Sequence, residues 1–379
     1  MLINKAYKIR IYPNKSQKEL INKTLGCSRF IYNQMLAERI RVYGHLKNNK
    51  ELLYKFKYKT EKEYKEEFEW LKEVDSVALQ QARKDLLQAF QNFYRGLRKG
   101  QKIGFPNFKK KKMKCSYRTI HPTTIRFEKN KIILLKLKGV KYKSKRKPFE
   151  GKIKSATVSR SATGKYYVSV LYEIKLNTKG IIFDTINENQ VIGLDMSLGN
   201  FYVDNNGNSP KYEKLYRENE AKLQKAQRIL SRKKRYSNNW YKQLLRVNKI
   251  YEKTKNKRND FTHKLSNSLV NSNTVICVEN LSLQGISQGL NFGKSVNDLG
   301  YREFIRQLEY KCLWNDKILL KADKFYPSSK TCSNCGYKNS DLQLSDRTWI
   351  CPECGEQHDR DKNAAINLKN YAIREISVA

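Results

Sequence analysis

The chain has 379 residues, and its 77 lysines and arginines against 36 acidic residues give a formal net charge of +41. Such an excess favours a polyanionic partner, and the 24 tyrosines and 15 phenylalanines make nucleic acid the expected one. The sequence lacks the apolar run of roughly 18 residues that a membrane-spanning helix needs, and its N-terminus does not resemble a signal peptide. We therefore expect no membrane partner and a cytoplasmic protein that associates with the nucleoid when it is bound to DNA.

The N-terminal third combines one strand with several helices. Residues 2–12 alternate as a strand, and a helix follows with Ser16 as its expected cap and Glu19 at the capping-box position. Helical patterning resumes over 51–73, where acids and bases alternate as on a solvated face. A further helix over 76–97 carries its apolar residues on one side.

A basic segment separates these helices from a β-rich region. Residues 91–118 contain ten lysines or arginines and no acid, including a run from Lys109 to Lys112. From residue 123 to about 175 the apolar period drops to two, which predicts a small antiparallel barrel or sheet. Residues 174–190 are typical of a linker.

The second half of the chain alternates strands and helices. The expected elements are strands over 191–195 and 200–204, one or two long basic helices over 211–260, a strand over 274–279, a helix over 298–316, a strand over 318–320 and a final helix from about residue 361. This order is that of a ribonuclease-H-like α/β layer fold.

Three acids stand where these elements begin or end. Asp195 ends one strand, Glu279 ends a second, and Asp361 begins the last helix. Neighbouring strands would bring the first two carboxylates together, and the helix would supply the third. Mg²⁺ prefers carboxylate oxygens, and a pair of such ions can hydrolyse a phosphodiester. Taken singly, each acid is typical of a turn or a helix cap, and Asp359 competes with Asp361 for the catalytic role.

Four cysteines have the spacing of a zinc site. They are arranged as C-x2-C, a gap of 15 residues and C-x2-C, and consist of Cys332, Cys335, Cys351 and Cys354. Four thiolates close the coordination sphere, so one structural Zn²⁺ is expected, and the alternative of a redox pair fits two such motifs poorly. Ser328, Ser329, Lys330 and Arg347 line the ribbon and are candidate phosphate contacts.

The sequence resembles the TnpB (OrfB) family, transposon-associated nucleases related to type V CRISPR effectors. The resemblance covers nearly the whole chain and depends on the segments GLDMSLGNF (193–201), VENL (278–281), FYPSSKTC (325–332) and HDRDKNAA (358–365), and on KAYKIRIYP (5–13), ALQQA (78–82) and GFPNFK (104–109) in the N-terminal half.

This resemblance implies an RNA-guided DNA endonuclease of an insertion sequence. A guide RNA transcribed from the element would direct cleavage of double-stranded DNA next to a short target-adjacent motif, and the element could encode a separate transposase as a further partner. Asp195, Glu279 and Asp361 match the catalytic acids that hold Mg²⁺, and the four cysteines match the zinc ligands. The alternatives are a nuclease-inactive RNA-guided repressor and a transposase-accessory DNA-binding protein.

The resemblance also implies a multidomain α/β and α+β fold. The expected parts are a wedge β-barrel (1–15 and 116–185), a helical recognition lobe (16–115), a RuvC nuclease core (186–326, with a basic helical insertion at 211–270), a zinc ribbon (327–357) and a RuvC C-terminal helix (358–379). In such an arrangement Gln80, Thr123 and Thr124 would read the target-adjacent motif, since Gln can pair with adenine and Thr can contact a thymine methyl group. Lys109 and Lys110 are further candidate contacts with nucleic acid.

Overall fold

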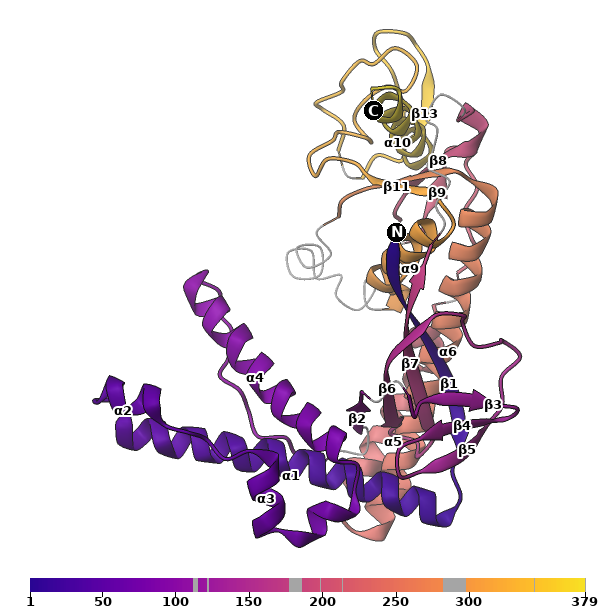
Figure 1. Ribbon diagram of the computed structural model, residues 1–379. Helices are drawn as coiled ribbons and strands as arrows, with labels where there is room; N and C mark the ends of the chain where they lie inside the picture. Colours follow the sequence, from indigo (N-terminus) through magenta and orange to yellow (C-terminus); the bar gives the residue numbers. More distant parts are fainter. Residues whose placement is uncertain are drawn as a thin grey trace. The chain divides into compact units, whose positions relative to one another are not determined.

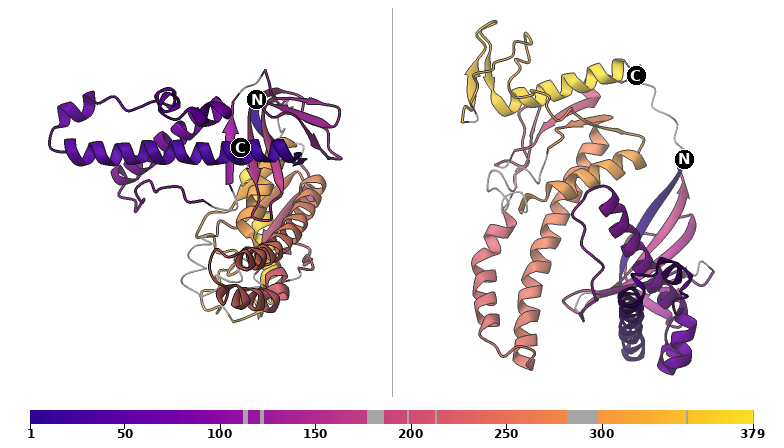
Figure 2. Two further views of the ribbon diagram at one scale, coloured as in Figure 1. Left: turned by 90° about the horizontal axis from the view of Figure 1, so that it is seen from below. Right: turned by 90° about the vertical axis from the view of Figure 1, so that its left-hand side faces the viewer.

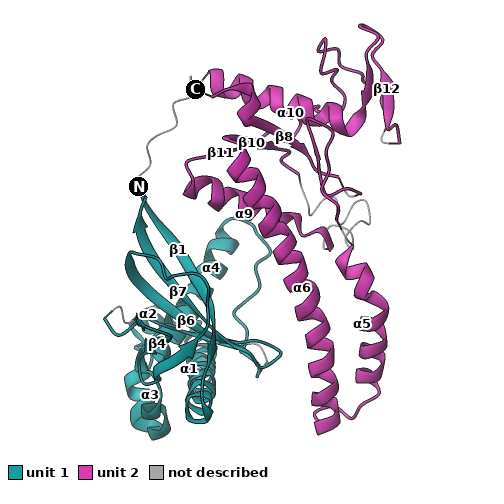
Figure 3. Cartoon of the chain, turned by 90° about the vertical axis from the view of Figure 1, so that its right-hand side faces the viewer, with its two compact units in different colours: residues 1–176 teal, residues 177–379 magenta. Residues whose placement is uncertain are grey.

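The computed structural model describes residues 1–111, 115–120, 123–176, 186–197, 199–212, 214–281, 298–343 and 345–378 (Figure 1). The chain divides into two compact units, residues 1–176 and residues 177–379 (Figure 3). Lys112 and most of the linker predicted over 174–190 lie outside the described residues.

Unit 1 contains a seven-stranded antiparallel sheet. Its strands are β1 (Leu2–Tyr12), β2 (Cys115–Thr119), β3 (Arg126–Glu128), β4 (Lys131–Leu134), β5 (Lys138–Tyr142), β6 (Lys152–Arg160) and β7 (Tyr166–Lys175). They lie in the order β2-β6-β7-β1-β5-β4-β3. Strand β1 buries alternate residues, among them Tyr7, Ile9 and Ile11, as its period-two pattern predicts. The predicted N-terminal strand and the predicted antiparallel sheet are therefore confirmed.

Two long helices, α1 (Lys15–Leu46) and α4 (Ser76–Arg98), pack against each other through a core that includes Ile31, Leu36, Leu79 and Leu86. Helix α1 does not begin with Ser16 as its cap. Asn14 caps it instead, and the Gln17 side chain completes the capping box: Gln17 N donates to Asn14 Oδ1 at 2.9 Å, and Asn14 N donates to Gln17 Oε1 at 3.1 Å. Asn14 already has the extended backbone of a cap, two residues earlier than predicted.

The helix predicted over 51–73 is also wrong as one continuous element. The chain forms α2 (Lys50–Lys55), α3 (Glu61–Glu67) and a 3₁₀ turn (Glu69–Glu73). Residue Phe56 is extended, and its ring packs against Tyr58, which in turn lies 4.3 Å from the guanidinium of Arg39 on α1. These aromatic contacts outweigh the local helical pattern, and a new capping box at Thr60 starts the next helix.

Unit 2 is built on a four-stranded mixed sheet in the order β11-β10-β8-β9. Its strands are β8 (Val191–Asp195), β9 (Val203–Asp204), β10 (Val275–Val278) and β11 (Ile318–Lys321). Strand β10 runs parallel to both β8 and β11, and β9 is antiparallel to β8. Each of these four strands was expected from the sequence.

Helices cover both faces of this sheet. On one face Ile192, Leu194 and Ile276 belong to a core with α6 (Asn238–Ser272) and α9 (Tyr301–Trp314). On the other face Val191 and Cys277 pack against α10 (Arg360–Ser377). The helices predicted over 298–316 and from residue 361 are thus confirmed as α9 and α10.

The long basic segment forms two helices, α5 (Leu215–Ser231) and α6, which run antiparallel and side by side (Figure 2). Between them lies a small core that includes Leu223 and Val247. A two-stranded antiparallel sheet of β12 (Thr348–Ile350) and β13 (Gln357–Asp359) precedes α10. None of the helices in the described ranges combines the length and apolar character that crossing a bilayer requires.

Candidate active site and metal centres

Two of the three expected acids lie next to each other at the carboxyl edge of the unit 2 sheet. Asp195 is the last residue of β8, and Glu279 directly follows β10. These strands are parallel, with Leu194 opposite Val278, so the register continues to Asp195 and Glu279. Because side chains alternate along a strand, both acids project to the face that α10 covers. The two carboxyl groups lie close enough for each to shift the pKa of the other.

The electrostatics of this pair fit a cation site. Burial raises the pKa of Asp195 well above its usual range, and the nearby charges of Glu279 and Asp361 raise it further. Burial also raises the pKa of Glu279, although hydrogen bonds from Ser328 and Asp195 oppose that shift. A divalent cation bound between them would neutralise both charges and offset the cost of burying them.

Asp361 joins the pair from the first turn of α10. Asp359 is the cap of this helix, since Lys362 N donates to Asp359 Oδ1 at 2.9 Å, whereas the charge of Asp361 acts on both Asp195 and Glu279. Within the described residues, the three carboxyl groups do not have oxygens that all lie within 4.8 Å of one another. A pair of ions roughly 3.5–4 Å apart would span a site wider than that.

Gly193 explains how α10 comes so close to the sheet. A Cβ atom on Gly193 would lie 2.0 Å from the carbonyl oxygen of Ala365 and 2.6 Å from the amide nitrogen of Lys369, both on α10. No side chain fits at that distance. A glycine two residues before Asp195 therefore lets the helix that carries Asp361 rest directly on β8.

Ser328, a residue that the sequence did not single out as a partner of the acids, touches the site directly. Its hydroxyl donates to Glu279 Oε1 at 2.7 Å, and the side chain is buried. Arg347, expected to contact phosphate, lies with its Nη1 3.8 Å from Asp361 Oδ1. Lys330 instead donates from Nζ to the carbonyl of Ser340 at 2.8 Å.

The four cysteines form a compact group whose sulfur atoms all lie within 4.8 Å of one another. Two of the Sγ–Sγ distances, between Cys332 and Cys354 and between Cys335 and Cys351, are 3.6 Å. A tetrahedral Zn²⁺ with Zn–S bonds of about 2.3 Å separates its sulfurs by about 3.8 Å, so the group fits this ion. His358 Nε2 lies 3.0 Å from Cys332 Sγ, and its ring packs against Trp349.

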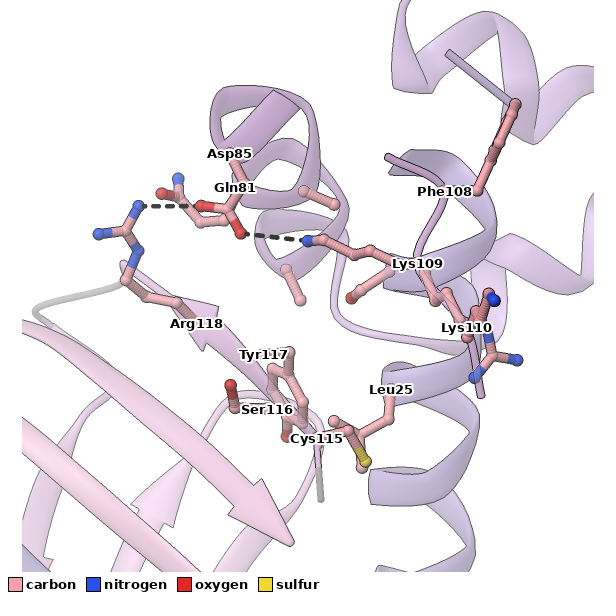
Figure 4. Close-up of a pocket in the computed structure, with 14 residues that line it drawn as sticks. Leu25, Gln81, Asp85, Phe108, Lys109, Lys110, Cys115, Ser116, Tyr117 and Arg118 are labelled. Carbon is pink, nitrogen blue, oxygen red and sulfur yellow. Dashed lines mark ion pairs between the residues drawn. The ribbon is translucent and has the colours of Figure 1, made fainter. Parts of the chain in front are cut away.

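In unit 1 a pocket of about 580 Å³ lies among α1, α4, the segment 108–110 and β2 (Figure 4). Asp85 pairs across it with Lys109 and Arg118, each at 3.7 Å. Gln81 and Ser28 line the pocket, and each is buried with a side-chain oxygen that has no hydrogen-bond partner. This combination of unpaired polar atoms and cations suits a polar, anionic ligand.

Of the residues in unit 1 that the sequence indicated as nucleic-acid contacts, only some line this pocket. Lys109 and Lys110 line it. Gln80 is exposed, and its neighbour Gln81 is the glutamine that lines the pocket. Thr123 and Thr124 lie at a turn before β3, the first exposed and the second half-buried, and are not among the lining residues. The signal for Gln81 was present in the sequence, because it lies three residues after the buried Ala78 on the same face of α4.

Three family models match the chain. They are described as "Helix-turn-helix domain" (residues 1–48), "Probable transposase" of the OrfB/IS605 type (residues 173–289) and "Cas12f1-like, TNB domain" (residues 301–368).

Two relatives match over almost the whole chain. A Streptomyces pristinaespiralis protein named as an RNA-guided DNA endonuclease is 31% identical, over 97% of this chain and 89% of its own length. The Escherichia coli protein InsQ, also named as an RNA-guided DNA endonuclease, is 30% identical, over 96% of this chain and 91% of its own length.

Among solved structures, a cryo-EM structure of a Cas12f1–sgRNA–target DNA complex has a similar fold. The match has a TM-score of 0.58 at 14% identity and covers 97% of this chain and 99% of the Cas12f1 chain. The chain has a fold similar to that of Cas12f1 and a sequence similar to those of the two endonucleases along almost its whole length. It therefore belongs to the TnpB (OrfB) family.

Proposed function

We propose that this protein is an RNA-guided DNA endonuclease of an insertion sequence that cleaves target DNA next to a short target-adjacent motif. The observation that carries the proposal is the meeting of Asp195 and Glu279 at the ends of adjacent parallel strands, with the charge of Asp361 acting on both. The names of the two long relatives support the same activity.

In this proposal Asp195, Glu279 and Asp361 hold Mg²⁺ against the scissile phosphate. The ions, when bound, activate water and stabilise the leaving oxygen. The chain contributes the geometry: β8 and β10 fix two carboxylates side by side, and the close packing that Gly193 permits brings the third from α10. Burial raises the pKa of Asp195, so a cation bound there would favour the charged carboxylate and lower that pKa again.

The four cysteines hold one structural zinc ion, because a sphere filled by four thiolates leaves no position for water. In domain terms, residues 186–326 and 358–379 form a RuvC nuclease domain with the ribbon at 327–357 between its parts. Residues 1–15 and 116–185 are the wedge β-barrel, and residues 16–115 are the recognition lobe inserted in it.

A guide RNA and the target DNA are the proposed partners, with the excess of positive charge as the reason for affinity. In guided nucleases base pairing reads the target, and the protein reads only the adjacent motif and the shape of the duplex. Gln80, Thr123, Thr124, Lys109 and Lys110 are the proposed contacts in unit 1. Arg347 and Lys330 are the proposed phosphate contacts beside the acids.

The second candidate function is a guided DNA-binding repressor that does not cut. All three acids are present, and two of them are buried side by side. Burying two acids destabilises the fold, and a protein that only binds DNA has no use for such a pair. This observation favours the nuclease.

The test is to express the chain together with the DNA that flanks its gene, sequence the RNA that co-purifies, and offer the complex a plasmid library in which random bases adjoin the guide-matched target. Cleavage that needs Mg²⁺, the guide and one adjacent motif is expected. Asp195→Ala should bind the plasmid without cutting it, while Asp341→Ala, at an exposed acid of the ribbon, should cut normally. If the complex binds the target but never cuts, the repressor function is correct. If Asp195→Ala cuts at the wild-type rate, the assigned site is wrong.

A further inference from the structure

We propose that Ser328 is a positioning residue for the carboxylate centre, and that the zinc ribbon controls the affinity of that centre for divalent cations through Ser328 and Asn367. This inference rests on the proposed function, because it assigns a role within the same centre.

The first step is the contact between Ser328 and Glu279. The Ser328 hydroxyl donates to Glu279 Oε1 at 2.7 Å, and Ser328 is only 4% exposed. Glutamate has three side-chain torsions, and it follows its strand rather than lying within it. A buried donor on one carboxylate oxygen holds these torsions before any ion arrives, so less side-chain entropy is lost when the ion binds.

The second step is that Ser328 itself is held by α10. The Asn367 side-chain amide donates from Nδ2 to the carbonyl oxygens of Ser328 at 2.7 Å and Thr331 at 2.6 Å. Asn367 is 4% exposed, and with both of these contacts it satisfies the two amide protons that burial would otherwise leave unpaired.

The third step connects the same helix face to the zinc ligands. Asn363, one turn before Asn367, donates from Nδ2 to Thr331 O at 2.8 Å and accepts at Oδ1 from Ser333 N at 2.9 Å. Thr331 and Ser333 flank Cys332, the first cysteine of the zinc group. The turn that carries Cys332 is therefore fixed to the helix that also carries Asp361.

Together these contacts form one network. The ribbon reaches Glu279 through Ser328, and two buried asparagines fix it to the helix of Asp361. Arg347 of the ribbon adds an ion pair to Asp361 at 3.8 Å. A ribbon that served only as a peripheral module would need neither a buried serine on a catalytic acid nor an asparagine beneath that serine. The geometry assigns the ribbon to the positioning of the acids.

The test measures binding of Mn²⁺, as a probe for Mg²⁺, to the zinc-loaded full chain by isothermal titration calorimetry. The difference between wild type and Asp195→Ala defines the carboxylate-dependent sites. Ser328→Ala is expected to weaken that binding by about tenfold to a hundredfold, the usual effect of losing a partner of a metal ligand. Ser328→Thr, which keeps the hydroxyl, should restore most of the affinity, and the neighbouring Ser329→Ala should match wild type.

A second readout separates positioning from collapse of the site. In the guided cleavage assay, Ser328→Ala should need more Mg²⁺ for half-maximal rate but approach the wild-type rate at saturating Mg²⁺. Asn367→Ala keeps the serine hydroxyl but removes its support, so we expect a smaller loss of Mn²⁺ affinity with unchanged zinc content. Thermal melts followed by circular dichroism check that each variant is folded.

Wild-type Mn²⁺ affinity in Ser328→Ala would overturn the role of Ser328, and wild-type affinity in a folded Asn367→Ala would overturn the role of the ribbon. A failure of the proposed function looks different. Wild type and Asp195→Ala would then bind Mn²⁺ equally, and no guided cleavage would occur at any Mg²⁺ concentration.

Discussion

The ionised Asp195 destabilises the folded, metal-free protein, because its pKa in the folded state lies above its pKa in the unfolded chain. The folded state then binds more protons than the unfolded state, so stability falls as pH rises from the ordinary carboxyl range through the raised pKa. Asp195→Asn removes the buried charge and can donate a hydrogen bond to Glu279. We expect it to stabilise the metal-free protein at pH 7 by about 1 kcal/mol, the size of an ordinary stabilising substitution.

Thermal melts of wild type and Asp195→Asn in a chelator, between pH 4 and pH 8, check this prediction. The difference in melting temperature should be small at pH 4 and should grow as pH rises. Adding Mg²⁺ should stabilise wild type but not the variant, because only the acid binds the ion. A difference in melting temperature that stays constant with pH would show that the buried charge of Asp195 does not destabilise the fold.

Gly193 makes a second prediction at this scale, with an internal control in Gly26. Gly193→Ala would place a methyl group 2.0 Å from a backbone oxygen of α10, whereas a Cβ on Gly26 of α1 meets nothing within 4 Å. Gly193→Ala should therefore destabilise unit 2 by about 3 kcal/mol, at the upper end of overpacking costs. Gly26→Ala should stabilise α1 by up to about 1 kcal/mol, since alanine favours helices.

Denaturant titrations of both variants provide the measurement, and cleavage assays follow the site. Because Gly193→Ala forces α10 away from β8, we also expect loss of cleavage. Equal stabilities for Gly193→Ala and wild type would mean that α10 does not lie directly on β8.

At the scale of elements, we expect the ribbon to depend on the proposed zinc ion more than on its apolar core. The buried residues of its core are Cys332, Leu342, Trp349 and Cys351, too few to hold a fold by themselves. Removal of zinc by a strong chelator should unfold the ribbon, expose Trp349 and shift its fluorescence to longer wavelength. The same treatment of Trp349→Phe, which keeps the three other tryptophans, should give no shift. A shift that persists in Trp349→Phe would place the metal-dependent change elsewhere.

Periodicity in the sequence predicted most elements of both units, because each strand or helix has one face that must be buried. The strand of Val275 to Val278 and the helix that starts at Arg360 are examples, and they were enough to place Glu279 and Asp361 at element ends. The helix over 51–73 failed because the ring of Tyr58 packs under Arg39, a contact between segments far apart in the chain. Local pattern holds no information about such a contact.

The same distinction applies to the site. The four cysteines and three acids could be found because each is required by a chemistry with a known spacing or position. Ser328 was expected only to contact phosphate, and Asn367 carries no signal in the sequence. A serine and a helical asparagine are common, and only the fold brings them to Glu279 and the ribbon. Gln81 lies between these cases: its exposed neighbour Gln80 was the expected contact, although the helical period of α4 is enough to put Gln81 on the buried face.

At the scale of the whole molecule, the net charge of +41 makes binding to nucleic acid strongly dependent on salt. Four consecutive cations, Arg232 to Arg235, lie exposed in the turn between α5 and α6. Replacing all four by glutamine should weaken guide RNA binding and reduce the slope of log K against log salt by up to about 3, at roughly 0.7 per phosphate contact with a single strand. Filter-binding titrations at several salt concentrations measure the slope. An unchanged slope would exclude this turn from the RNA interface.

The central claim is that Asp195, Glu279 and Asp361 together form one centre for divalent cations, and diffraction from crystals of the protein soaked in Mn²⁺ tests it most directly. We predict anomalous difference density for Mn²⁺ at the three carboxylates, with carboxylate oxygens at about 2.0–2.2 Å from the ions, and its loss in Asp195→Ala crystals. Anomalous density confined to other places in the crystal, with none at these carboxylates, would contradict the account.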